Sequence, residues 1–292
     1  MTTVSINREF KAKVEQIQEL PTLPEISRQL LELQANPNAS VRQLVEVIEN
    51  DPVSATQILK FANSAFFNNA RKIESLNDAI NLFGFDNALN CTISLATAKK
   101  FTIPLDGPIG MRAFWEHAIY SAHLMQILAR KVKTKNSPKP GLAYLAGLLH
   151  NFGYVLLGHA FPEDFNQLNN AMRLSASPDV LPVELNTPGI HHYQLGLWFM
   201  RKWALPTEIL VAVFEHHNEN YRGKNFEYAN LALLSDRILF TNGITCDVDY
   251  DELPPRILTA LNIDHVVVQA AVKELLEDNG DRIDGLIRAL TP

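Results

Sequence analysis

The chain has 292 residues, of which 47% are hydrophobic and 20% are charged, and its formal net charge is −6. This length and composition allow a substantial soluble core, in one large domain or in two ordinary ones. The negative charge excludes a general electrostatic attraction to nucleic acid or to an anionic membrane surface, so we expect neither as a partner.

The first third of the sequence predicts a series of short amphipathic helices. Ser40 is a candidate N-cap for a helix whose apolar residues form one stripe over 41–48. Asp51 followed by Pro52 is a strong helix start, because a capping carboxylate precedes proline at the first helical position. The segment 75–78 resembles a capping box with aspartate in its third position. We expect a small helical half that ends near residue 103.

The segment 102–108 contains two prolines and a glycine, and it is the expected boundary inside the chain. Residues 1–103 then form an N-terminal helical half, and residues 104–292 form a larger helical half with a C-terminal helical extension. Apolar periodicity in the second half predicts helices at about 111–134, 141–158, 162–175, 189–203, 206–217 and 226–241. No stretch alternates with period two, so the predicted fold class is all-α and multi-helical.

The location of the protein is predicted from three features. Residues 142–161 contain no charged side chain and would just span a bilayer. His150 and Asn151 lie inside this stretch, where polar groups would be costly in a membrane, so we interpret it as a core helix of a soluble protein. Cys91 and Cys246 have no CxxC partner, and the N-terminus has no apolar signal segment. We therefore expect a cytoplasmic protein.

Histidines are concentrated in the second half, within the helices predicted there: His117, His150, His191, His192, His216 and His217. A single histidine on an apolar helix face is more often a hydrogen-bonded core residue than a metal ligand. The two pairs are more suggestive, because successive helix positions diverge by about 100° and rarely serve one packing role. No CxxC or HExxH signature fixes a metal site. The residues alone predict a helical protein with a histidine-rich pocket, and they leave metal binding open.

Nine short motifs carry a resemblance to a known family. They are Leu20–Pro24, Ile48–Pro52, Phe61–Phe67, Ala79–Gly84, Phe114–His117, Ala146–Gly153, Gly189–His192, Trp203–Pro206 and His216–His217. In this order, over about residues 18–217, they are similar to the motifs of the HDOD family, regulatory relatives of the HD and HD-GYP phosphohydrolases in bacterial signalling. The resemblance implies an N-terminal helical subdomain followed by an HD-like helical subdomain.

The resemblance also implies a metal centre. Catalytic HD relatives bind metal through a histidine, a His-Asp pair and a distant aspartate, and the HD-GYP branch adds further histidines. Carried over to this sequence, the implied ligand set is His117, His150, Asn151, His192, His216, His217 and Asp236.

This sequence departs from the HD pattern at two positions and in one motif. Asn151 replaces the aspartate of the pair, Tyr154 takes the lysine position of the HDxGK form, and no GYP triplet follows His217. A neutral amide holds a cation less firmly than a carboxylate does, and metal-assisted hydrolysis needs a firmly held cation. We interpret the centre as degenerate, with no catalytic residues and no resident cofactor, and a residual iron, manganese or zinc ion stays open.

The function implied by the resemblance is a non-catalytic bacterial signal-transduction output or adaptor module that acts through protein partners. The alternative is a metal-dependent phosphohydrolase that acts on a nucleotide or a cyclic dinucleotide. A third reading is a nucleotide-binding sensor without turnover. The sequence does not identify the signalling partner or the ligand.

Overall fold

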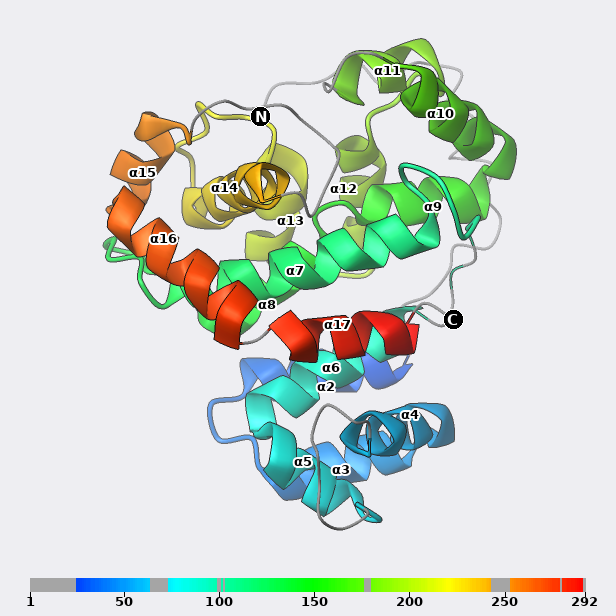
Figure 1. The fold of residues 1–292 in the computed structure, drawn as a ribbon, viewed down its shortest axis with the longest axis vertical. Helices are drawn as coiled ribbons and strands as arrows, with labels where there is room; N and C mark the ends of the chain where they lie inside the picture. The colour runs from blue at the N-terminus through cyan, green and yellow to red at the C-terminus, as the bar shows by residue number, and fades with distance from the viewer. Residues whose placement is uncertain are drawn as a thin grey trace. The chain divides into compact units, whose positions relative to one another are not determined.

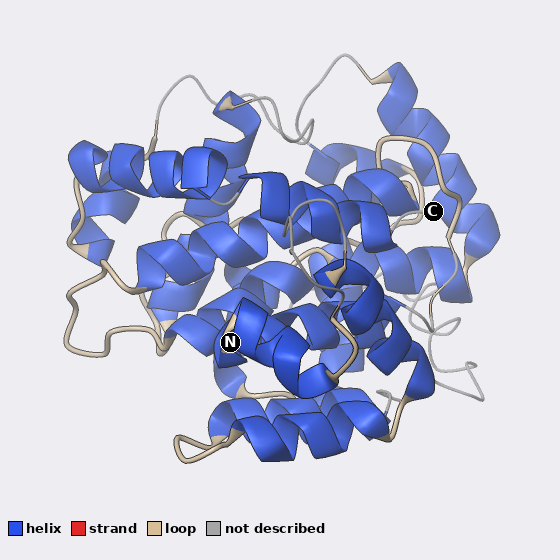
Figure 2. Cartoon of the chain, turned by 60° about the horizontal axis from the view of Figure 1, so that its bottom comes forward, coloured by secondary structure: helices blue, strands red, loops and turns tan. Residues whose placement is uncertain are grey.

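The computed structural model describes residues 25–63, 73–98, 101, 103–175, 180–242, 253–278 and 280–290. Within these ranges the chain consists of helices and loops, without a strand (Figure 2). The predicted all-α fold class is confirmed. Cys246, the motif at 20–24 and most of the motif at 61–67 lie outside the described residues.

The described helices form two compact units. The larger unit contains the helices between residues 103 and 273. The smaller unit contains those between residues 25 and 101, together with those between 274 and 290 (Figure 1). The division of the chain into halves at residues 103 and 104 stays a prediction.

The smaller unit begins its helices where the sequence predicts them. Its helices are α2 (Glu25–Ala35), α3 (Val41–Glu49), α4 (Pro52–Ala62), α5 (Leu76–Phe83), α6 (Phe85–Ala98), the π-helix η2 (Glu274–Asp278) and α17 (Gly280–Leu290). The hydroxyl of Ser40 accepts a hydrogen bond from the third backbone N–H of α3, and Ser75 does the same for α5. Asp51 Oδ2 accepts from Ser54 N at 3.3 Å at the start of α4. The three predicted N-caps are confirmed.

The larger unit is built around α7 (Met111–Ala129), which is buried along most of its length. Helix α7 packs along α8 and contacts α14 and α16, so its apolar residues surround it rather than forming one stripe. The other helices are α8 (Pro140–Leu149), α9 (Phe152–Ala160), α10 (Pro162–Leu174), α11 (Val180–Asn186), α12 (His192–Lys202), α13 (Thr207–Glu215), α14 (Phe226–Thr241), α15 (Pro255–Leu261) and α16 (His265–Lys273).

The single helix expected over 141–158 is two helices, with the break at His150 and Asn151. His150 Nδ1 lies 2.7 Å from the carbonyl oxygen of Gly147, which in an uninterrupted helix would accept the N–H of Asn151. Asn151 leaves helical geometry, with φ −98° and ψ 10°. The imidazole therefore takes a backbone acceptor at the point where the helix ends.

The apolar segment is a core element of the larger unit. Residues Pro140–Ala160 are the one described stretch long and apolar enough to cross a membrane, with a mean hydropathy of 1.2. However, 89% of this stretch is buried inside the protein, as expected for the core of a soluble fold. The cytoplasmic location stays a prediction.

Helices α9 and α12 approach closely at Gly153. A Cβ atom at this position would lie 1.9 Å from the backbone oxygen of His192, so no larger residue fits without moving the start of α12. This contact links the backbone after His150 directly to the backbone that carries His192.

Candidate metal centre

Three side chains from distant parts of the chain meet in the first cluster. His117 lies on α7, His150 follows α8, and Asp236 lies on α14. His150 Nε2 is 3.1 Å from both His117 Nε2 and Asp236 Oδ1, and His117 Nε2 is 3.2 Å from the same oxygen. The three ligand atoms therefore converge on one small volume.

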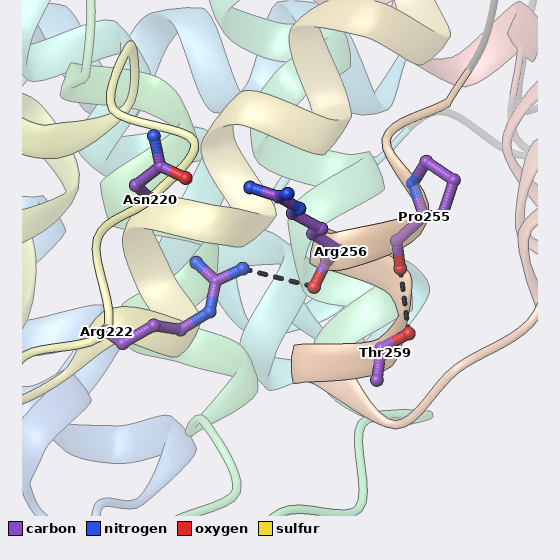
Figure 3. A pocket seen from close by; sticks show the side chains of 5 residues that line it. All are labelled: Asn220, Arg222, Pro255, Arg256 and Thr259. Carbon is purple, nitrogen blue, oxygen red and sulfur yellow. Dashed lines mark hydrogen bonds between the residues drawn. The ribbon is translucent and has the colours of Figure 1, made fainter.

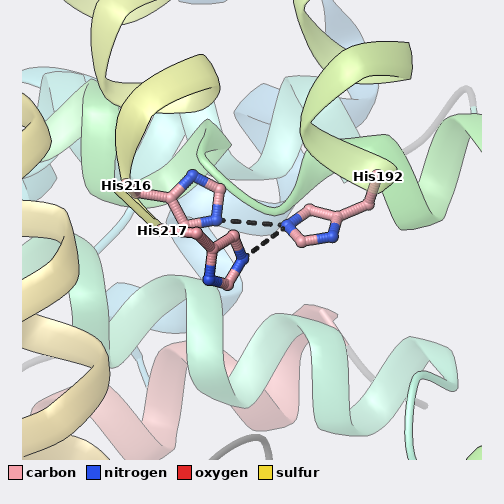
Figure 4. Close-up of side chains that lie close together, drawn as sticks. All are labelled: His192, His216 and His217. Carbon is pink, nitrogen blue, oxygen red and sulfur yellow. Dashed lines mark hydrogen bonds between the residues drawn. The ribbon is translucent and has the colours of Figure 1, made fainter. Parts of the chain in front are cut away.

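A second cluster consists of histidines alone. His192 opens α12, and His216 and His217 follow α13. His192 Nε2 lies 3.1 Å from His216 Nε2 and 3.3 Å from His217 Nε2, and the three rings face one another (Figure 4). The two clusters adjoin, because the rings of His150 and His216 are 5.1 Å apart in an edge-to-face arrangement. Six candidate ligands thus form one continuous group.

Hydrogen bonds on the far side of the rings decide which nitrogens face the centre. His150 Nδ1 lies 2.7 Å from Gly147 O, and His216 Nδ1 lies 2.9 Å from Val213 O. A carbonyl oxygen only accepts, so each Nδ1 carries the proton and each Nε2 presents a lone pair. His192 Nδ1 likewise donates to a carboxylate oxygen of Glu184 at 2.6 Å. The imidazoles of His150, His192 and His216 are therefore held in the tautomer that binds metal through Nε2.

These lone pairs need a positive species between them. With both Nδ1 atoms protonated, His192 and His216 direct two bare Nε2 atoms at each other over 3.1 Å. Two acceptors at this distance repel unless a proton or a cation lies between them. The donors form two groups of three, three imidazole nitrogens in one and two imidazole nitrogens with a carboxylate oxygen in the other, and both sets of donor types fit zinc, iron or manganese.

Three of the candidate ligands have protonation states that suit metal binding. Burial, reinforced by the neighbouring histidines, lowers the pKa of His216 well below its ordinary value and lowers that of His217 to about 3. Burial alone would raise the pKa of Asp236, but His150 and His117 outweigh it and lower this pKa well below its ordinary value. Near pH 7 the two histidines are neutral and Asp236 is charged, which are the states that ligate metal.

Asn151 contributes a buried oxygen beside the first cluster. Its side chain does not cap α9, and its Oδ1 atom has no hydrogen-bond partner among the described residues. A buried acceptor left in this way costs about 1–3 kcal/mol. The amide oxygen can accept from a water molecule or ligate a cation, but it brings no charge.

The structure brings together the six predicted titratable residues, and Asn151 lies at the adjoining helix break. Sequence reasoning missed α11 and its residue Glu184, which contacts His191 and His192. The sequence offered only a weak indication of this role for Glu184. It is one acidic residue between the apolar Val183 and Leu185, eight positions before His192.

A separate pocket of about 410 Å³ lies between α15 and the loop after His217, and it contains none of the six ligands. Arg222 and Arg256 line it together with Asn220, Pro255 and Thr259 (Figure 3). Arg222 Nη2 donates to the backbone oxygen of Arg256 at 3.1 Å, and Nη1 donates to that of Tyr221 at 2.7 Å. Arg222 therefore ties the loop to α15.

The fold and the cluster define an all-helical protein with a histidine- and aspartate-lined centre of the HD type. The HDOD domain matches residues 20–219, and the chain belongs to the HDOD family.

Two solved structures and one curated relative illustrate the similarity. A putative signal transduction protein from Marinobacter aquaeolei is 30% identical, with a TM-score of 0.87 over 99% of this chain and 68% of that one. A putative phosphohydrolase from Shewanella amazonensis shares the fold at 19% identity, with a TM-score of 0.68 over 96% of this chain and 98% of that one. An uncharacterized protein of Treponema pallidum is 25% identical over 82% of this chain and 46% of its own length. The chain thus spans less than half of that relative.

Proposed function

We propose that this protein is a regulatory signal-transduction module that holds one divalent cation in its histidine and aspartate centre and acts by binding partner proteins, without turnover. The carrying observation is the cluster itself. Its Nε2 atoms converge, Nδ1 hydrogen bonds fix the tautomers of His150, His192 and His216, and the position of the missing carboxylate holds the neutral Asn151.

Charge favours one cation over two. Among the six ligands only Asp236 carries a negative charge. Two divalent cations about 4 Å apart, as in two-metal hydrolases, repel each other by about 17 kcal/mol at an effective dielectric constant of about 20. Ligand carboxylates normally offset this repulsion, and Asn151 removes one of them. The charge of the centre therefore favours a single cation.

The alternative is a metal-dependent phosphohydrolase that acts on a nucleotide or a cyclic dinucleotide. A bound divalent cation would supply Lewis acidity toward a phosphoryl oxygen. The converging ligand set favours this alternative. The burial of that set weighs against it, because His150 and His216 are at most 1% exposed and a substrate needs direct access.

The test compares metal content and turnover in four proteins. Wild type, Asn151→Asp, His150→Ala and the control Asn169→Asp are purified without a tag, dialysed against iron, manganese and zinc without chelator, and analysed for metal per chain. Asn169 is a matched control, because it is a buried asparagine of the same unit whose side chain binds the 106–109 loop.

We expect about one equivalent in wild type and in the control, a higher content in Asn151→Asp, and a lower one in His150→Ala. None of the four should hydrolyse bis-p-nitrophenyl phosphate or cyclic di-GMP. A metal-free wild type would overturn the proposal. Metal-dependent hydrolysis by wild type that His150→Ala abolishes would establish the phosphohydrolase instead.

A further inference from the structure

Glu184 is a fully buried carboxylate behind the three-histidine cluster. It lies on α11 and has 0% exposed area. Its Oε1 atom accepts from His192 Nδ1 at 2.6 Å, and its Oε2 atom accepts from His191 Nδ1 at 3.1 Å and from the backbone N–H of His192 at 3.3 Å. Both carboxylate oxygens are therefore committed to the residues that start α12.

Tyr154 completes this arrangement from α9. Its hydroxyl hydrogen-bonds to Glu184, and its ring stacks on that of His192 with the centroids 4.4 Å apart and the planes 21° apart. The imidazole of His192 is thus held in its plane by Tyr154 and at its outer edge by Glu184. The remaining freedom of the ring is small, and its Nε2 atom is aimed at His216 and His217.

The charge on Glu184 needs an explanation. Its two oxygens accept hydrogen bonds from three N–H donors, His192 Nδ1, His191 Nδ1 and the backbone of His192, and these donors stabilise the ionised carboxylate. A buried carboxylate costs several kcal/mol unless a positive charge compensates it. The carboxylates of Glu184 and Asp236 both contact histidines of the centre, and one divalent cation would balance their two negative charges.

We propose that Glu184 is a positioning residue for the cation. It fixes the Nδ1-protonated tautomer and the orientation of His192, and it supplies from behind the histidine the negative charge that Asn151 does not supply from residue 151. This inference rests on the proposed function, because it requires that a cation binds. On this proposal, the affinity of the centre for its cation depends on Glu184, which is not one of the six candidate ligands. Tyr154 contacts both Glu184 and His192 and holds them together.

Zinc affinity tests the proposal in paired variants. Glu184→Gln is compared with Glu227→Gln, since Glu227 is an equally buried glutamate of the same unit that accepts from Thr134. Tyr154→Phe keeps the ring that stacks on His192 and removes the hydroxyl that hydrogen-bonds to Glu184. Its control is Tyr228→Phe, which also removes a hydroxyl, one that accepts a hydrogen bond from Lys139 N. Dissociation constants are measured by competition with a chromophoric chelator, and folding is verified by circular dichroism.

Outer hydrogen-bond partners of ligating histidines change metal affinity by about 10–100-fold. We expect that loss in Glu184→Gln, a loss of about 2–10-fold in Tyr154→Phe from one hydrogen bond, and less than about 2-fold in both controls. Nitrogen-15 shifts of His192 in the chelator-treated protein should report protonated Nδ1 in wild type and a mixture of tautomers in Glu184→Gln.

The outcomes separate the two proposals. If wild type binds no zinc, both proposals fail together. If wild type binds zinc and both Glu184→Gln and Tyr154→Phe bind it equally well, the positioning role is refuted and the proposed function stands. Lower stability of Glu184→Gln with unchanged zinc affinity would assign Glu184 to the fold alone. Should Glu184→Gln fail to fold, Tyr154→Phe decides by the same measurement.

Discussion

Gly153 lies between the helix break at His150 and the start of α12, and its replacement by alanine tests how tightly the centre is built. The added Cβ atom would lie 1.9 Å from the backbone oxygen of His192, whereas ordinary contacts begin near 3.4 Å. The two backbones must therefore separate by about 1.5 Å, because a backbone oxygen cannot rotate away as a side chain can. His192 would move with its backbone.

The expected magnitude is the difference between two effects. Alanine gains about 1 kcal/mol over glycine in a helix. Overpacking costs about 1–3 kcal/mol and occasionally more, and a rigid backbone neighbour places Gly153→Ala at the upper end. The net loss is about 2 kcal/mol, or about 3 °C in melting temperature for a chain of 292 residues. Zinc affinity should also fall by at least about 10-fold, because ligand distances tolerate only about 0.2 Å.

The assay is thermal denaturation by circular dichroism in chelator, followed by zinc competition. Gly196→Ala is the matched control on the α12 side of this contact, because its Cβ atom would lie 3.0 Å from a side-chain atom of Val213 and no closer than 3.6 Å to the backbone of Gly153. It should melt within about 1 °C of wild type and bind zinc normally. A Gly153→Ala protein that is as stable as wild type, with unchanged zinc affinity, would refute the close approach and the coupling to His192.

In chelator, the free energy of unfolding should fall as the pH falls. Burial, with the charge of His192, lowers the pKa of His217 from 6.5 to about 3, so the unfolded chain takes up the proton first and stability is lost below about pH 6.5. The lowered pKa of Glu184 adds a loss of about 3 kcal/mol between its unfolded value of 4.5 and about 2. Urea denaturation at stepped pH measures both losses: constant stability from pH 7 to 4 would contradict the first, and constant stability from pH 4.5 to 2 would contradict the second. Zinc at about 100 times its dissociation constant should raise the unfolding free energy by about 2.7 kcal/mol in wild type. The gain should be less than half as large in His216→Ala, whose side chain joins the two clusters, and an equal gain would show that zinc binds elsewhere.

Local features of the sequence were sufficient for the helices. Ser40, Asp51 and Ser75 start helices where their capping chemistry predicts, because a cap depends only on the following three residues. Two helix predictions were wrong: α11 was missed, and an uninterrupted helix was expected over 141–158 because apolar periodicity continues through His150. The hydrogen bond from the His150 imidazole to the carbonyl oxygen of Gly147, which accompanies the end of the helix, cannot be recognised from apolar periodicity.

The ligand set was predictable only through the family resemblance. Composition and spacing did not decide whether the histidines are core residues or metal ligands. His117 and His150 are 33 positions apart, and His150 and Asp236 are 86 positions apart, so no local pattern shows that they meet. Their convergence depends on how α7, α8 and α14 pack together, and helical periodicity does not encode that.

The sequence by itself determined that this protein is all-α, that it belongs to the HDOD family, and that residue 151 brings no charge to the centre. Tertiary structure decided which nitrogen of each histidine faces inward, because the Nδ1 acceptors of His192 and His216 are set by packing and by the local fold of α13. It also decided that Glu184 lies behind His192. A buried carboxylate acquires its role from the groups that surround it, and those groups come from separate helices.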